Sequence, residues 1–209
     1  MMKLLGLAAV ISFLAASATV INFDTAPVGQ LPPGWSAKMT NRGQAPRWEI
    51  RKDQSAPTQP YVLAQVSTDP NLSRWPLAIF NDKLLRDGDV SVRLKPVGGS
   101  DPQGGLVWRY RDENNYYLVR ANAGEKRVAV YKVQNGQRTL LQPGVTRDIP
   151  SNGWSTLKVS ARGNRFQVYV DHRRVLQGWD GTFTSPGKVG LWTGGDAVTY
   201  FDDFRVIAR

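Results

Sequence analysis

Short runs of β-branched and aromatic residues follow one another from residue 47 to the end of the chain, each bounded by Gly, Pro, Asn or Asp. No apolar period of three to four residues is sustained in this part, so the pattern predicts an all-β domain. The expected strands span residues 48–51, 61–66, 77–80, 90–94, 105–110, 116–121, 127–133, 138–141, 154–161, 165–170, 174–178, 188–193 and 198–207. Thirteen strands at this spacing predict two packed antiparallel sheets, a jelly-roll sandwich.

The stretch GGLVWRYRDENNYYLVRAN at residues 104–122 combines aromatic and arginine side chains more densely than any other, and it reads as two strands joined by the turn DENN. Successive strand residues point to opposite faces of a sheet. Trp108 and Tyr110 therefore share one face, which we expect toward the core, and Arg109 belongs to the other.

The N-terminus reads as an export signal. Lys3 precedes the apolar run LLGLAAVISFLAA, which ends in the small-residue pattern Ala16-Ser17-Ala18. The run of about 13 residues is shorter than the roughly 20 that a membrane-spanning helix needs. We expect residues 1–18 to be a signal peptide, residues 19–209 to be one domain, and the protein to be periplasmic or extracellular.

The expected mature chain is basic. Without Lys3 it holds 26 basic and 17 acidic residues, and it has no cysteine, so no disulfide framework is available. This charge favours a polyanionic partner such as an acidic envelope polysaccharide. Nucleic acid is a poor candidate, because the chain has no helix-turn-helix, zinc-finger or RNA-binding motif. Charge and pattern do not predict an oligomeric state.

Six segments together resemble a known superfamily: FD at residues 23–24, GLVWRYRDENNYYLVR, VAVYKVQNG, WSTLKVSARGNRFQVYVD, VGLWT and YFDDF. In this order they are similar to the concanavalin A-like jelly rolls of bacteria, above all to secreted domains grouped with 3-keto-disaccharide hydrolases and to laminin-G-like sugar-binding modules. The similarity spans residues 21–207. It implies a carbohydrate ligand, but the superfamily contains lectins, binding modules and glycosidases alike.

We expect the ligand on a concave, solvent-facing sheet. Sugar-binding sheets stack aromatic rings on sugars and hydrogen-bond the hydroxyls with polar side chains. Trp192 alternates with Val189 and Leu191, which favours its exposure. The expected ligand-binding residues are Arg109, Asp112, Asn114, Tyr116, Arg120 and Trp192. In the alternative, Arg109 and Arg120 pair with acidic neighbours across the strands.

The known retaining glycosidases of the laminarinase type need the motif E-x-D-x-x-E, whose alternation places two carboxylates on one face. The chain has three glutamates, Glu49, Glu113 and Glu125, and none of them begins this motif. A hydrolase of the 3-keto-disaccharide type would have to use an aspartate, with Asp112 as the candidate acid or base. His172 is the single histidine, and its place between two strands favours a turn residue that tolerates positive φ.

In jelly rolls of this superfamily the first and last strands lie side by side, and acidic residues on them can hold Ca²⁺. The resemblance therefore implies a structural calcium site at Asp24, Asp202 and Asp203. Asp202 and Asp203 are adjacent, so their side chains diverge unless a β-bulge intervenes. The alternative is that these carboxylates cap loops or pair with Arg205.

Taken together, the sequence favours an exported protein that binds a carbohydrate or glycopolymer on one sheet. A glycoside hydrolase is the first alternative. A module of the cell envelope that binds another protein is the second.

Overall fold

The computed structural model describes residues 18–209, which form strands and loops without any helix. All thirteen expected strands are present, and two more, β1 and β2, precede them. The strands are β1 (Ala18–Ile21), β2 (Trp35–Thr40), β3 (Trp48–Lys52), β4 (Tyr61–Gln65), β5 (Trp75–Leu85), β6 (Gly88–Gly98), β7 (Gln103–Asp112), β8 (Asn115–Asn122), β9 (Arg127–Gln134), β10 (Gln137–Thr146), β11 (Ser155–Arg162), β12 (Arg165–Val170), β13 (Arg173–Trp179), β14 (Gly187–Trp192) and β15 (Val198–Ala208).

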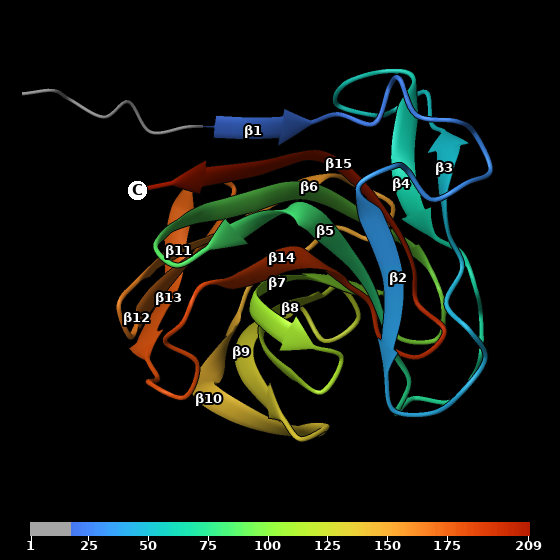
Figure 1. Ribbon diagram of the computed structural model, residues 1–209. Coiled ribbons are helices and arrows are strands. Elements are labelled where there is room, and N and C mark those ends of the chain that lie inside the picture. Colours follow the sequence, from blue (N-terminus) through green and yellow to red (C-terminus); the bar gives the residue numbers. More distant parts are fainter. Residues whose placement is uncertain (1–17) are drawn as a thin grey trace, which may run out of the picture.

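The strands form two antiparallel sheets, which confirms the expected jelly-roll sandwich. Sheet A has the order β13-β12-β11-β6-β15-β4-β3, with β1 paired to β15, and sheet B has the order β10-β9-β8-β7-β14-β5-β2. Figure 1 shows β1 running beside β15. The pattern of β-branched and aromatic residues did not predict β1 and β2. β1 adjoins the expected signal peptide, and the sequence of β2, WSAKMT, has few β-branched residues.

The expected signal peptide lies outside the described residues except for Ala18, which begins β1. Within residues 18–209, no helix has the length and apolar character needed to cross a bilayer.

Two hairpin turns have the backbone conformation that their residue types favour. Asn135 and Gly136 have φ values of 51° and 77°, and Asp171 and His172 have 47° and 66°. Two consecutive residues with positive φ match the twist of a β-hairpin, and Asn, Asp and Gly adopt such values most readily. His172 is therefore the turn residue that we expected.

The main core lies between the sheets. Trp35 packs there against Phe80 and Phe204, with ring centroids 5.4 Å and 5.0 Å away. Trp108 joins this core and stacks on Tyr117 at 5.2 Å, so its predicted burial is confirmed. Because successive residues of a strand point to opposite faces, the residues that alternate with such inward-facing side chains along the strands of sheet B point to its outer face.

A second apolar cluster fills that outer face of sheet B. Its members are Trp75, Leu77, Ile79, Val107, Tyr110, Tyr116, Leu118, Val133 and Trp192. The sheet curls around this cluster. The evidence is that the Thr40 hydroxyl on the edge strand β2 lies 2.8 Å from the Tyr116 hydroxyl on β8. Arg138 on the opposite edge strand, β10, likewise lies over the ring of Trp75 on β5. The outer face of sheet B is thus a concave surface that is largely packed with its own side chains.

Candidate ligand-binding site

Arg109 does not lie on the concave face, and the prediction that it faces solvent is wrong. It is 3% exposed, and its guanidinium donates to the backbone carbonyls of Phe183, Arg86 and Gly163. The cause is a β-bulge. Arg109 has a φ of 49°, and the pairing of β7 with β8 shifts between Trp108 and Asp112.

The same bulge overturns the expectation for Tyr110. Because the extra residue shifts the alternation, Tyr110 joins the outer cluster instead of sharing the inner face with Trp108. Its ring lies 6.1 Å from that of Tyr116. Arg109 is therefore a structural residue that ties three loops together at one end of the sandwich.

Tyr116 and Trp192 are on the concave face, as the alternation predicts, but both are fully buried there. The expectation that Trp192 is exposed is wrong because the curl of sheet B covers it. Burial raises the pKa of the Tyr116 hydroxyl, against the opposing effects of the Thr40 hydrogen bond and the Arg138 charge. These two fully buried rings form the floor of the concave face.

Arg120 also lies on the concave face, and it is 8% exposed. Its guanidinium contacts Asp101 at 2.8 Å and Glu125 at 3.0 Å, and it donates to the Gln103 amide oxygen. Burial lowers the pKa of Arg120, but the hydrogen bond and charge of Glu125 outweigh it and raise the pKa above its ordinary value. The alternative of acidic neighbours is therefore the arrangement observed at this residue.

Asp112 and Asn114 lie at the rim of the concave face, as expected. Both are exposed, and they line a groove of about 640 Å³ between the β7–β8 turn, the β9–β10 turn and the end of β2. The Asp112 carboxylate accepts hydrogen bonds from the Asn114 backbone N–H at 2.8 Å and from the Asn115 amide at 2.9 Å. Asp112 thus stabilises the turn, and the residues it touches are amides rather than a partner carboxylate.

The sequence reasoning missed Arg138, whose side chain extends from the edge strand β10 over the concave face. Its guanidinium lies between two aromatic rings, 4.9 Å from the centroid of Trp75 and 4.7 Å from that of Tyr131. The charges of Arg120 and Glu125 also act on it. We call these five residues, Trp75, Arg120, Glu125, Tyr131 and Arg138, the Arg138 cluster.

The N–H groups of the Arg138 guanidinium are not used in hydrogen bonds within the described part of the chain. The two rings partly desolvate the guanidinium, which lowers the pKa of Arg138 from its ordinary value although the residue as a whole is exposed, and the charge of Arg120 acts in the same direction. A guanidinium that is oriented by flanking rings and has unused N–H groups can bind paired hydroxyls or a carboxylate.

The acidic residues of the expected calcium site come together at the junction of β15 and the loop before β4. Thr58 donates its backbone N–H to Asp202 and its hydroxyl to Asp203, both at 2.8 Å. The side chains converge because β15 has a bulge here, where Asp203 has a φ of 49°. Asp203 contacts Arg93 at 3.5 Å, and Asp24 accepts the backbone N–H of Tyr61 at 3.0 Å.

These residues fit an ion only in part. Within residues 18–209 there is no group of three or more Asp, Glu, His or Cys side chains placed to hold a metal. Burial raises the pKa of Asp202 to about 7, and the charges of Asp203 and Asp24 act in the same direction. A cation here would relieve that repulsion, but backbone carbonyls would have to complete its coordination.

Comparison with known proteins gave no match to a family model. One curated relative, the levanase of Bacillus subtilis (strain 168), is 34% identical over 120 residues. The match covers 56% of this chain and 16% of the levanase, so the chain corresponds to a small part of that protein.

Solved structures share the fold over most of their length. The carbohydrate-binding module CBM66 from Bacillus subtilis has a TM-score of 0.62 at 22% identity, covering 82% of this chain and 94% of the module. Domain 4 of AbnA, an extracellular arabinanase from Geobacillus stearothermophilus solved with arabinotriose, has a TM-score of 0.59 at 13% identity, covering 92% and 93%. A β-glucanase of Bacillus licheniformis has a TM-score of 0.58 at 12% identity, covering 92% and 98%. The chain therefore has the jelly-roll sandwich that these carbohydrate-active proteins share.

Proposed function

We propose that this protein binds carbohydrate on the concave face of sheet B, with the Arg138 cluster as the centre of the site. The observation that supports this most directly is the Arg138 guanidinium, which is fixed between two rings and keeps its N–H donors unused. Sugar hydroxyls are suited to such donors, and a lining that includes aromatic side chains suits the apolar parts of a sugar ring. The kinship with a levanase segment and with carbohydrate-binding domains agrees with this assignment.

Two features extend the site. Arg120 beside Glu125 and Asp101 offers both donors and acceptors next to Arg138. The rim groove adds the exposed Asn114 amide at the other end. The formal charge of +10 favours acidic polysaccharides among the possible ligands, because long-range attraction concentrates polyanions at the surface.

Affinity electrophoresis in gels that contain levan, arabinan or polygalacturonate tests the proposal. The wild-type protein should be retarded by at least one polymer, and Arg138→Ala and Trp75→Ala should each weaken binding by roughly tenfold or more. Arg173→Ala is a matched control, because Arg173 is exposed on β13 in the other sheet. Equal retardation of all four proteins would contradict the proposed site.

The same polymers separate binding from hydrolysis. A binding protein leaves the amount of reducing ends unchanged, whereas a glycosidase that depends on Asp112 would release them and lose this activity in Asp112→Ala. A protein partner that associates without any glycan would instead support the envelope-module alternative.

We also propose a location outside the cytoplasm and a structural Ca²⁺ whose ligands come from Asp24, Asp202 and Asp203, with backbone carbonyls completing the coordination. Phe23, which precedes Asp24, and the candidate ligand Asp203 have φ values of 67° and 49°, a backbone strain that a bound ion would help to offset. The N-terminal signal pattern and the extracellular arabinanase among the structural relatives support export.

A further inference from the structure

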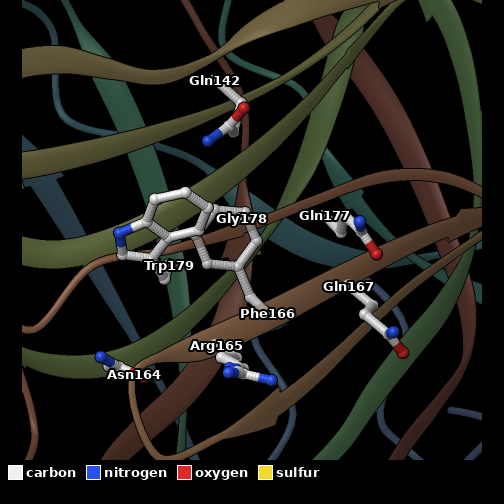
Figure 2. A pocket seen from close by; sticks show the side chains of 8 residues that line it. All are labelled: Gln142, Asn164, Arg165, Phe166, Gln167, Gln177, Gly178 and Trp179. Atoms are coloured by element: carbon white, nitrogen blue, oxygen red, sulfur yellow. The ribbon is translucent and has the colours of Figure 1, made fainter.

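A second cavity lies away from the concave face, where the edge strands of the two sheets meet. It has a volume of about 640 Å³ and is lined by Gln142 of β10, Asn164 of the β11–β12 turn, Arg165, Phe166 and Gln167 of β12, and Gln177, Gly178 and Trp179 of β13. β10 and β13 are the outermost strands of sheets B and A. Figure 2 shows the Trp179 indole in front of Phe166, with the side-chain amides around it.

Trp179 is the exposed member of the tryptophan set. The chain has seven tryptophans, all within the described residues; five are buried, Trp154 is half-buried, and Trp179 is 73% exposed. Its strand pairs with β12, where Arg165 lies opposite Trp179. The ring therefore projects from the end of a paired strand, and most of its surface faces solvent.

The floor of the cavity is shaped by Gly178. A Cβ at this position would lie 2.6 Å from the Phe166 ring and 2.8 Å from Cγ of Gln142. The missing side chain lets Gln142 cross from the other sheet and bring its amide beside Trp179. Phe166 belongs to the main core, so this floor is continuous with it.

The polar groups around the ring are available to a ligand. Within the described part of the chain, the side-chain amides of Gln142, Asn164 and Gln177 make no hydrogen bond, while Gln167 accepts one from the Tyr169 hydroxyl at 2.8 Å. An amide offers a donor and an acceptor together, as a sugar hydroxyl does. An apolar protein surface would leave these amides without partners, which is costly once they are buried.

We propose that this cavity is a second saccharide-binding site, in which Trp179 stacks on a sugar ring and the amides of Gln142 and Gln177 bind its hydroxyls. Arg165 is the only charged residue that lines it among the described residues, so an acidic sugar would also be accepted. The inference stands apart from the Arg138 cluster, because the two sites share no residue. A chain with two such sites would hold a polysaccharide at two points and gain avidity.

Acrylamide quenching of tryptophan fluorescence tests the site, because Trp179 is the exposed fluorophore. Comparison with Trp179→Phe isolates its signal. We expect at least one of levantriose, arabinotriose and trigalacturonate, at up to about 10 mM, to reduce this quenching about twofold in a saturable manner. The double variant Gln142→Ala, Gln177→Ala should need about tenfold more saccharide, while Leu84→Ala, an exposed leucine outside the cavity, should behave as the wild type.

Three results would overturn the proposal. The first is quenching that none of the three saccharides reduces. The second is protection of Trp179 that grows with protein concentration alone, which would make this surface a contact between copies. The third is loss of the protection in Arg138→Ala, which would mean a single site. Conversely, if Arg138→Ala binds polysaccharide as the wild type does, the concave-face site is wrong and the proposed Trp179 site is unaffected.

Discussion

Arg109 and Arg138 show how one residue type serves two purposes in the same sheet. Arg109 is enclosed, and its guanidinium is used by three backbone carbonyls. Arg138 is exposed, and its guanidinium is oriented by two rings and keeps its donors. The first arrangement contributes to stability and the second is suited to recognition, since only unused donors can bind a ligand.

The role of Arg109 predicts a loss of stability without a loss of binding. Arg109→Ala leaves buried carbonyls without donors, so the free energy of unfolding should fall by about 2–4 kcal/mol. Arg109→Lys should recover only part of this, because an ammonium lacks the planar fork that reaches several acceptors. Urea unfolding measures the change, with Arg173→Ala as the control. Normal stability of Arg109→Ala would refute the structural role.

The residues of the binding face were only partly predictable. Alternation correctly placed Trp192 on the opposite face from Val189 and Leu191, because the face of a strand residue is a local property. It failed at Arg109, since a bulge is not visible in the pattern. Trp75 could have been found by extending the alternation of Leu77 and Ile79 back by one step.

At the scale of strands, the curl of sheet B requires close approach of neighbouring backbones. A Cβ at Gly190 of β14 would lie 2.3 Å from the Ala78 carbonyl oxygen on β5, and one at Gly105 of β7 would lie 2.3 Å from that of Val119 on β8. Glycine allows strands to approach where a side chain would collide. These two positions therefore support the curvature that covers Trp192 and brings Arg138 over Trp75.

Gly190→Ala should consequently destabilise the protein by about 1–3 kcal/mol, because the backbone must shift to relieve the overlap. Gly181→Ala is the matched control, since a Cβ there would meet no atom within 4 Å. Thermal unfolding of the two variants provides the comparison. Equal midpoints for both would contradict the close approach.

Strand positions were predicted well because hydrophobic alternation and turn residues are local signals. The sequence did not predict that the outer face of sheet B is buried, because this burial depends on contacts between strands that are far apart in the sequence. Thr40 and Tyr116 meet only when the sheet curls, and nothing in either segment alone reveals that contact. The consequence is a smaller accessible site than an open sheet would offer.

At the scale of the whole molecule, the loop before β4 is joined to the last strand through Thr58, Asp202 and Asp203. Burial and two neighbouring carboxylates raise the pKa of Asp202 to about 7 in the folded protein, above the ordinary value of 3.8. The folded state therefore binds the proton more tightly than the unfolded state does. This contribution is fully present below the unfolded pKa and is lost as the pH rises through the folded pKa.

With a chelator present, the free energy of unfolding should fall by roughly 2–4 kcal/mol from about pH 4 to about pH 8 through this group. Asp202→Asn, which cannot ionise, should remove that part of the pH dependence. If Ca²⁺ binds the ionised carboxylates, adding it at the higher pH should restore the stability. If Ca²⁺ does not change the unfolding midpoint of the wild type, the proposed Ca²⁺ site is wrong. If the stability of Asp202→Asn depends on pH as that of the wild type does, the ionisation of Asp202 is not the cause of that dependence.

The central claim is that carbohydrate binds at the Arg138 cluster. Backbone and side-chain NMR shifts of the labelled protein, followed during titration with levan or polygalacturonate oligosaccharides, test it most directly. We predict that, outside the Trp179 cavity, the largest shifts occur at the Trp75 indole, the Arg138 guanidinium and Tyr131, with smaller ones at Glu125. A saccharide that binds the protein without shifting Trp75 or Arg138 would contradict the claim.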